Sequence, residues 1–456
     1  MGEIVLLSRI QFALNIAFHY LFPPLTIGLA LILVIMEAVY LATKKPIYQQ
    51  MTKFFVHIFA VIFAVGVATG LVQVFAFGTN WARFSHFVGD VFGSILGAEG
   101  IFAFFLESGF LALLLFGWNR VGPKTHFFST IMVCLGSHFS GLWIVVANSW
   151  MQTPSGYKII GEGAERHAII DKWWTVINNP SAWDRFVHVI FGCWLAGAFL
   201  VMSIAAYYLL KNRHIDLAKR SFVIALIVAS FTVLAQGVSG DSTGRGVARN
   251  QPIKLAAIEG IYKTVTPTRI YTFGWTNPAK EETKGIYIPG LLSFLVYRNF
   301  DQPVPGLDQF PRELWPPVAV VFQTYHWMLL MWGLMFIGAI LGWIAVARWR
   351  KKKKSYFILW YSMFSVLFPE VGNQMGWYTA EIGRQPWVVY GLMKTADGVS
   401  LSLVPGQVVS SLILFVVVYA LIFALFIYLL DRKIRIGPQD YDSGMDQYHD
   451  PYARTT

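Results

Sequence analysis

Residues 376–387 carry the densest group of chemically active side chains in the chain. This stretch holds an acid, Glu381, a base, Arg384, and two tryptophans, Trp377 and Trp387. It follows an apolar run, and a charge at the edge of a lipid-spanning segment is costly unless it is paired, hydrated or ligand-bound. Tryptophan favours the water–lipid interface. Composition alone therefore leaves two interpretations open, an interfacial loop and a binding site.

Of the ten histidines, the four that matter most by position are His19, His138, His188 and His326. Neutral imidazole is a good ligand for haem iron, and a thioether opposite it raises the reduction potential. Met328 is the nearest thioether to His326. A lone membrane histidine is more often hydrogen-bonded across helices, and a lone methionine more often packs in the core. Residue type alone does not choose between these roles.

Two glutamates, Glu99 and Glu107, fall in a single apolar run. A charged acid at the centre of a spanning helix costs roughly 2.5–3.5 kcal/mol on insertion scales. The pair lies about 12 Å apart along a helix axis. Such acids face an interior cavity or another helix, either as a hydrogen-bonded structural pair or as carriers that take up and release protons.

The composition is that of a polytopic membrane protein. The chain has 456 residues, of which 56% are hydrophobic and 13% charged, and its mean hydropathy is +0.53. Its net charge of +11 lies in short loops between apolar runs, so membrane topology explains the charge better than nucleic-acid binding does. The two cysteines, Cys134 and Cys193, lie inside apolar runs and suit buried thiols, not a disulfide framework.

A spanning helix needs about 20 mostly apolar residues, and nine segments qualify. They are residues 12–41, 54–78, 92–117, 126–150, 184–210, 217–239, 317–347, 356–376 and 407–430. The sequence thus predicts an all-α fold of about nine transmembrane helices. No cleavable signal peptide is expected, because the first apolar run is too long.

Basic residues predict the orientation of these helices. Lysines and arginines concentrate in alternate loops, at 44–53, 120–124, 211–220, 348–354 and 432–435. The positive-inside rule makes these loops cytoplasmic, so the N-terminus lies outside and the C-terminus inside. The predicted divisions are 1–239 with six helices, an outer loop 240–316, 317–435 with three helices, and a cytoplasmic tail 436–456.

Several motifs together closely resemble subunit I of the cytochrome bd quinol oxidases. They are Gly-Arg-Gln-Pro-Trp at 383–387, Glu-x7-Glu-Ser at 99–108, Asn-Ser-Trp-Met-Gln at 148–152 and Lys-Leu-Ala-Ala-Ile-Glu at 254–259. The resemblance runs from Arg9 to Trp387. It implies that the chain is the haem-bearing subunit of a quinol:O2 oxidoreductase.

The resemblance implies a set of haem ligands near the outer face. His188 and Met328 would hold the low-spin haem b558, and His19 and Glu381 would serve the high-spin haems b595 and d, in an order that stays open. One departure from the family is His326, where arginine is common, and it offers a second possible ligand beside Met328. Further haem-binding candidates are Arg9, Trp377 and Arg384. The two arginines would pair with haem propionates, or alternatively anchor lipid headgroups.

The same resemblance implies routes for protons and quinol. Glu99, Glu107, Ser108 and Ser140 would carry protons from the cytoplasm toward the haems. In the outer loop, Lys254 would hydrogen-bond a quinol oxygen and Glu259 would accept its proton.

The implied partners are ubiquinol or menaquinol, O2 and a second, smaller membrane subunit, with small single-span subunits as further candidates and no nucleic acid. The implied location is the cytoplasmic membrane of a bacterium or archaeon. Two alternatives stay open: a related oxidase with only b-type haems, including a third haem b in place of haem d, and a haem-free ion or solute transporter.

Overall fold

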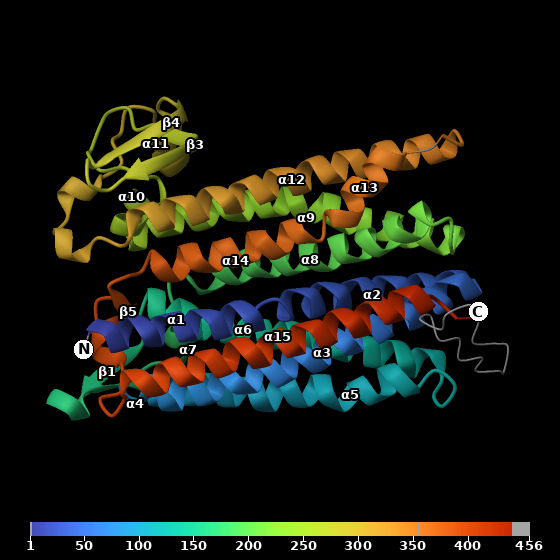
Figure 1. Ribbon diagram of the computed structural model, residues 1–456, viewed down its shortest axis with the longest axis horizontal. Helices are drawn as coiled ribbons and strands as arrows, with labels where there is room; N and C mark the ends of the chain where they lie inside the picture. Colours follow the sequence, from blue (N-terminus) through green and yellow to red (C-terminus); the bar gives the residue numbers. More distant parts are fainter. Residues whose placement is uncertain (1, 354, 440–456) are drawn as a thin grey trace.

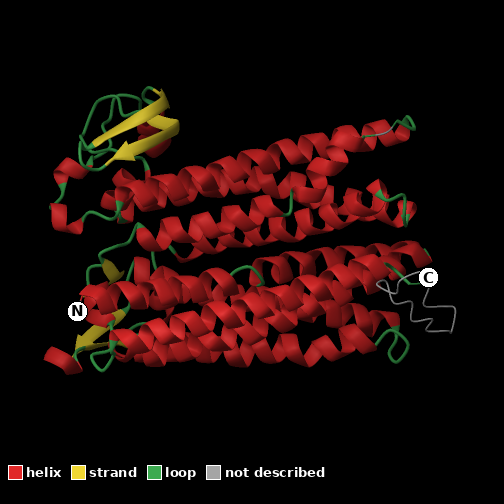
Figure 2. Cartoon of the chain, in the orientation of Figure 1, coloured by secondary structure: helices red, strands yellow, loops and turns green. Residues whose placement is uncertain are grey.

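The computed structural model of the chain describes residues 2–353 and 355–439. Long helices run side by side along one direction, and short strands occur only in the loops at one end (Figures 1 and 2). The predicted all-helical membrane architecture is confirmed. The predicted tail, 436–456, lies outside the described residues from 440 onward.

Within the described residues, eight helical segments are long and apolar enough to cross a membrane. They are α1 (Gly2–His19) with α2 (Pro23–Thr43), α3 (Pro46–Thr79), α4 (Ala82–Glu99) with η1 (Gly100–Phe104) and α5 (Phe105–Phe116), α6 (Pro123–Gln152), α8 (Ala182–Leu210), α9 (Ile215–Asn250), α12 (Val318–Arg350) and α15 (Pro405–Ile436). The ninth predicted span, 356–376, corresponds to two shorter helices, α13 (Tyr356–Phe364) and α14 (Leu367–Ile382).

Two of these helical segments are broken inside the bundle. The first breaks after His19, where Pro23 and Pro24 open α2, because proline has no backbone N–H to continue a preceding helix. The second break separates α13 from α14, where the Ser365 hydroxyl donates to the Ser362 carbonyl at 2.7 Å. The breaks place His19 at a helix end and give α14 its own direction.

The core is centred where α2 meets α8 and α9, around fully buried side chains such as Leu29, Phe199 and Phe222. At this contact Gly28 and Gly197 let two backbones touch. A Cβ on Gly28 would lie 2.0 Å from the Cys193 carbonyl oxygen. Only glycine permits this approach, which fixes α2 firmly against α8.

The non-helical parts gather at one end of the bundle, called here the hairpin end. Each sheet is a two-stranded antiparallel pair: β1 (Tyr157–Ile160) with β2 (His167–Ile170), β3 (Ile270–Asn277) with β4 (Glu282–Ile288), and β5 (Trp387–Val389) with β6 (Met393–Lys394). Short helices join them: α7 (Trp173–Ile177), α10 (Pro252–Ile258), α11 (Leu291–Tyr297) and the single turns η2 (Gly163–Glu165), η3 (Leu307–Gln309), η4 (Arg312–Leu314) and η5 (Thr395–Gly398). Because α9 continues to Asn250, the long loop begins about ten residues later than the sequence predicted.

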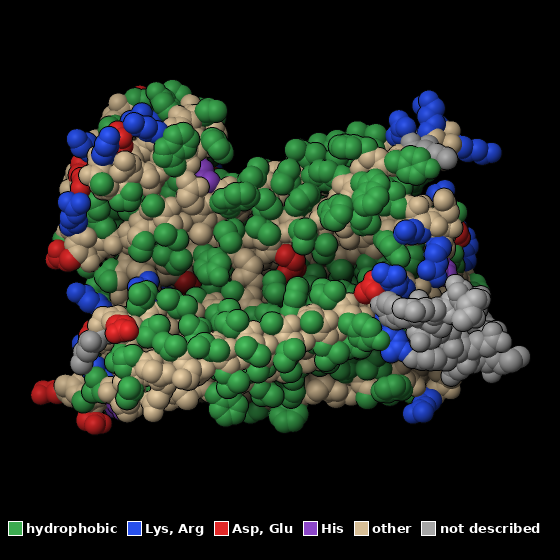
Figure 3. Space-filling model, in the orientation of Figure 1, with side chains coloured by type: hydrophobic (Ala, Val, Ile, Leu, Met, Phe, Trp, Pro, Cys, Tyr) green, Lys and Arg blue, Asp and Glu red, His purple; other side chains and the backbone are tan. Residues whose placement is uncertain are grey.

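The two ends of the bundle differ in charge. The opposite end, called here the basic end, is dominated by Lys and Arg side chains, whereas acidic side chains lie mainly at the hairpin end (Figure 3). Hydrophobic side chains cover much of the surface between the two ends (Figure 3). A broad exposed apolar surface of this kind suits lipid or another membrane subunit.

Candidate functional site

One face of α6 carries a row of polar side chains, called here the α6 polar stripe. Its members are His126, Thr130, Ser137, Ser140, Asn148 and Gln152. By helical geometry they fall within roughly 120° of the helix circumference and span about 39 Å along the axis. Each is hydrogen-bonded to a carboxylate from another helix; these are Glu37, Glu107, Glu99 and Glu381.

The two glutamates of the third span are held by serines of this stripe. The Ser140 hydroxyl donates to Glu99 Oε1 at 2.6 Å. The Ser137 hydroxyl donates to Glu107 Oε1 at 2.5 Å. Glu107 is buried, and Glu99 is half-buried. The structure therefore places both acids against α6, where they can pass protons along one side of a single helix.

The turn between the two acids explains why both reach α6. Residues eight apart in a regular α-helix differ by about 80° around the axis. The η1 turn is instead a π-helix, in which the Phe105 N–H donates to the Gly100 carbonyl. A π-turn accommodates one extra residue, so the directions of Glu99 and Glu107 around the helix axis are those of residues seven apart in a regular α-helix. The two side chains therefore point within about 20° of each other.

Ser108 does not join this arrangement. Its hydroxyl donates to the Phe104 carbonyl of its own helix at 2.7 Å. Ser137, which sequence reasoning did not single out, is the serine that holds Glu107. Its position three residues before Ser140, on the same helical face, is the signal that could have identified it.

At the hairpin end, Glu381 is the centre of a buried polar network, called here the Glu381 cluster. Its carboxylate forms an ion pair with Arg384 and accepts hydrogen bonds from Asn148 Nδ2 at 2.9 Å and Gln152 Nε2 at 3.3 Å. The Lys254 ammonium donates to Gln152 Oε1 at 3.0 Å. The outer loop and the residue 376–387 stretch thus meet at the last turn of α6.

The Glu381 cluster contains more positive than negative charge. Arg185 joins it by donating to Asn148 Oδ1, so two guanidinium groups and the Lys254 amine surround one carboxylate. Arg185 Nη1, Arg384 Nε and Arg384 Nη1 are buried without a hydrogen-bond partner. Burial lowers the pKa of Lys254 well below its usual value. Buried cationic donors without partners are costly, so this cluster suits an anionic ligand group such as a carboxylate.

The other two sequence-predicted haem-contact residues lie outside this network. Arg9 is half-buried on α1, and the described residues offer it no ion-pair partner. Trp377 packs against Tyr378, with ring centroids 5.0 Å apart.

Three predicted iron ligands, His19, His188 and Met328, lie on separate helices. His19 Nδ1 lies 3.0 Å from the Thr69 hydroxyl, and His188 Nδ1 lies 3.0 Å from the Ser239 hydroxyl. Each of the three faces a glycine on a neighbouring helix, namely Gly70, Gly240 and Gly376. A Cβ on Gly70 would lie 3.1 Å from the His19 ring, and one on Gly376 would lie 3.0 Å from Met328 Sδ. The absence of a Cβ at these glycines thus lets each of the three side chains pack closely against the backbone of a neighbouring helix.

His326 is not positioned to bind iron. Its Nδ1 lies 2.7 Å from the Phe322 carbonyl and its Nε2 lies 2.9 Å from the Tyr271 carbonyl. Both nitrogens are engaged with backbone oxygens, and the ring stacks on Phe322 with centroids 3.9 Å apart. The imidazole ties the hairpin β3–β4 to α12, which leaves Met328 as the candidate ligand on this helix.

The predicted quinol residues face different partners. Lys254 points into the Glu381 cluster, whereas Glu259 is hydrogen-bonded to Tyr325 on α12. Glu259 is buried, one of its oxygens has no partner, and burial raises the pKa of Glu259 to about 8.

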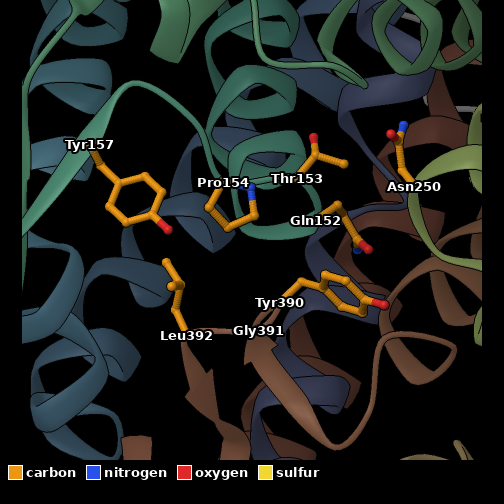
Figure 4. Close-up of a pocket in the computed structure, with 8 residues that line it drawn as sticks. All are labelled: Gln152, Thr153, Pro154, Tyr157, Asn250, Tyr390, Gly391 and Leu392. Atoms are coloured by element: carbon orange, nitrogen blue, oxygen red, sulfur yellow. The ribbon is translucent and has the colours of Figure 1, made fainter. Parts of the chain in front are cut away.

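An open pocket of about 380 Å³ lies beside Gln152 (Figure 4). Its lining residues are Gln152, Thr153, Pro154, Tyr157, Asn250, Tyr390, Gly391 and Leu392.

Sequence reasoning missed one of the acids that are hydrogen-bonded to the α6 polar stripe. Glu37 of α2 accepts hydrogen bonds from His126 and Thr130 near the basic end. Each residue alone gives little signal, because Glu37 is one acid near the end of the first predicted span and His126 is the first residue of the fourth.

Comparison with known proteins agrees with this arrangement. Residues 7–438 match the family described as cytochrome bd terminal oxidase subunit I. The chain is 38% identical to cytochrome bd ubiquinol oxidase subunit 1 of Bacillus subtilis, over 99% of this chain and 96% of the relative. It is 32% identical to cytochrome bd-II ubiquinol oxidase subunit 1 of Escherichia coli, over 97% and 98%.

A solved structure shows the same fold. The bd oxidase from Geobacillus thermodenitrificans superposes with a TM-score of 0.88 at 28% sequence identity, covering 96% of this chain and 99% of that one. The chain therefore belongs to the cytochrome bd terminal oxidase subunit I family.

Proposed function

We propose that this chain is the haem-bearing subunit of a terminal oxidase that oxidises quinol at the hairpin end and reduces O2 to water. The Glu381 cluster is the observation that carries the proposal. It places a candidate iron ligand beside two guanidinium groups, those of Arg185 and Arg384, whose unpartnered buried N–H groups suit the propionates of a haem.

The residues present fit haem groups. His188 and Met328 would hold a low-spin haem, b558, and His19 and Glu381 would serve two high-spin haems, b595 and either d or a third haem b. Bound haem supplies iron that accepts single electrons and binds O2. The chain's own contribution is to fix the ligands through Thr69, Ser239 and Asn148. Arg185 and Arg384 would neutralise the propionates.

Protons for the reaction would travel along the α6 polar stripe. Glu107 and Glu99 are the carriers, each oriented by a serine hydroxyl. Asn148 and Gln152 continue the stripe to the Glu381 cluster. If the basic end is cytoplasmic, as the loop charges predict, proton uptake crosses most of the membrane and turnover stores energy.

Quinol would be oxidised near Lys254 and Glu259. The pocket beside Gln152 has a volume typical of small-molecule sites, and Gln152 links it directly to Lys254. Glu259 would accept a proton from quinol only in its deprotonated form. It contacts Tyr325 and not the Gln152–Lys254 hydrogen bond.

The chain would work with a second membrane subunit in the cytoplasmic membrane of a bacterium or archaeon. The exposed apolar side chains of α4, η1 and α5, among them Phe102 and Phe105, supply a face for that subunit next to the buried acids. The protein is a multi-pass membrane protein, as its helices and its family show.

The test is to purify the chain with its natural partner and quantify haem per chain, the reduced-minus-oxidised spectrum and quinol-dependent O2 uptake. The proposal expects three haems and sustained O2 consumption. Absence of far-red absorption with full activity would favour the oxidase with only b-type haems. A colourless complex that consumes no O2 would overturn the proposal and favour a haem-free transporter.

A further inference from the structure

Glu37 of α2 forms a hydrogen-bonded unit with His126 and Thr130 of the α6 polar stripe, called here the Glu37 unit. His126 Nδ1 lies 2.6 Å from Glu37 Oε1, and the Thr130 hydroxyl donates to Glu37 Oε2 at 2.5 Å. His126 Nε2 lies 3.2 Å from the Leu114 carbonyl. The side chains of Glu37 and His126 are 1% and 2% exposed. An acid and an imidazole are thus joined inside the bundle with every polar atom engaged.

These contacts determine how many protons the unit holds. The Leu114 carbonyl can only accept, so Nε2 carries a hydrogen. Between Nδ1 and Oε1 there must be one further proton, on either the ring or the carboxyl. Without that proton, a nitrogen lone pair would face an oxygen lone pair at one of the two positions. The unit therefore holds one proton that the ring and the carboxyl share.

The unit lies where protons would enter from the basic end. Glu37 is about 9 Å from the end of α2, and His126 is about 4 Å from the start of α6. On that side, Trp118 packs against His126 with ring centroids 3.8 Å apart and ring planes tilted by 35°. The Lys53 ammonium lies 5.3 Å from the centroid of the same tryptophan ring. The ammonium group of Lys53 is thus separated from the Glu37 unit by the Trp118 ring.

The unit also shares a helix face with the proton carriers. Thr130 and Ser137 are separated by two turns of α6, about 10 Å along the axis. Ser137 holds Glu107, and Ser140 holds Glu99. Cys134 and Val133 lie between them, so transfer over this interval needs a short file of ordered water.

We propose that the Glu37 unit is a proton-loading site that supplies Glu107 during turnover. The inference rests on the proposed oxidase function and deepens it. In each transfer the shared proton leaves the unit for the Glu107 carboxylate, breaking one O–H or N–H bond and forming one O–H bond. A proton from the basic end then reloads the unit, and no electron moves.

A purely structural role is the alternative. A buried acid–base pair is weak evidence for stability, because well-packed apolar residues often replace one without loss. The double variant Glu37→Met with His126→Phe therefore separates the two roles. It retains packing between α2 and α6 and removes the exchangeable proton.

The experiment compares the wild-type complex with Glu37→Gln, Thr130→Val and the double variant, each purified with its partner subunit. Haem content, the optical spectrum, thermal stability, quinol-dependent O2 uptake and its solvent deuterium isotope effect are measured. Tyr208→Phe is the matched control, since it removes a buried hydrogen bond to Ile434 near the same end but lies off the α6 polar stripe.

The proposal expects Glu37→Gln and the double variant to keep the haem spectrum and to lose turnover by roughly tenfold or more, with an increased isotope effect. Thr130→Val should show a smaller loss, and Tyr208→Phe none. A stable double variant with wild-type turnover overturns the inference alone. A second outcome also overturns the inference: Glu37→Gln loses haem or stability, and the double variant regains these together with turnover. The unit then has a structural role. A wild-type complex without O2 uptake overturns the proposed function and this inference together.

Discussion

Lys254 and Glu381 are connected through a single side chain. The Gln152 amide accepts from the Lys254 ammonium at 3.0 Å and donates to the Glu381 carboxylate at 3.3 Å. Lys254 comes from the long loop, and Glu381 from the end of α14. The predicted quinol residue and the predicted iron ligand are therefore coupled more directly than their sequence separation suggests.

Replacing Gln152 with leucine should uncouple the two residues. Lys254 and Glu381 each lose one hydrogen bond but keep their other partners, and each lost bond costs about 0.5–1.5 kcal/mol. We expect a lower melting temperature and altered absorption from the high-spin haems.

Gln323→Leu is the control, because Gln323 donates to the Gly274 carbonyl, which lies outside the cluster. If both variants behave alike, the link through Gln152 has no special role.

The π-turn of η1 should be essential for proton delivery. Inserting one alanine next to Phe102 would add a residue beyond the one that the π-turn accommodates and rotate Glu99 by about 100° away from Ser140. Turnover should fall by roughly tenfold or more, measured as O2 uptake per haem. Phe102→Leu, which keeps the residue count at an exposed position, should retain full turnover; equal loss in both variants would argue against a role for the turn.

Thermal stability should depend on the protonation of Glu259. Its pKa rises from 4.5 to about 8 on folding because it is buried. Between these values the folded protein keeps a proton that the unfolded chain releases, so stability falls as pH rises from about 4.5 to 8. Below and above that window, this residue contributes no slope.

Melting temperatures of wild type and Glu259→Gln, measured from pH 5 to 9, test this expectation. The variant should lack the part of the decline due to Glu259. Parallel curves would show that Glu259 does not carry a raised pKa.

Quinol oxidation should also respond to Glu259. Only its deprotonated form can accept a proton from quinol, so turnover should rise with pH toward about 8. Glu259→Gln should be slow at every pH, with haem content unchanged. A wild-type profile that is flat from pH 6 to 9 would remove Glu259 from the role of proton acceptor.

Space opposite Met328 should be needed for the low-spin haem. A methyl group at Gly376 would lie 3.0 Å from Met328 Sδ and force the thioether to shift. Gly376→Ala should therefore weaken the low-spin band or shift its midpoint potential. Gly333→Ala on α12 is the matched control, since its Cβ would meet nothing within 4 Å and should change neither property.

Hydrophobic runs predicted the helices well, but polar helix ends escaped detection. Residues 2–11 form part of α1 although Ser8 and Gln11 are polar, because those side chains are buried against other helices. The last turns of α9 are similarly rich in glycine and charge. Hydropathy reports apolar length, and it misses turns whose polar groups find partners only in the folded bundle.

Motif resemblance predicted Glu99, Glu107 and Ser140, and the structure brings them together. It could not predict that Lys254 contacts the Glu381 cluster while Glu259 contacts Tyr325. Which way each side chain of α10 points depends on how this helix packs against its neighbours. The pairing of Glu37 with His126 was also out of reach, since the two residues are 89 positions apart.

The backbone contact at Gly28 and Gly197 has a consequence for energy conversion. It holds α2, which carries Glu37, at a set height against α8, which carries His188. The contact thereby fixes the depth of Glu37, where protons would enter, relative to the depth of His188, where electrons would arrive. The fraction of the membrane voltage that each transferred charge would cross therefore depends on how closely α2 and α8 are held together.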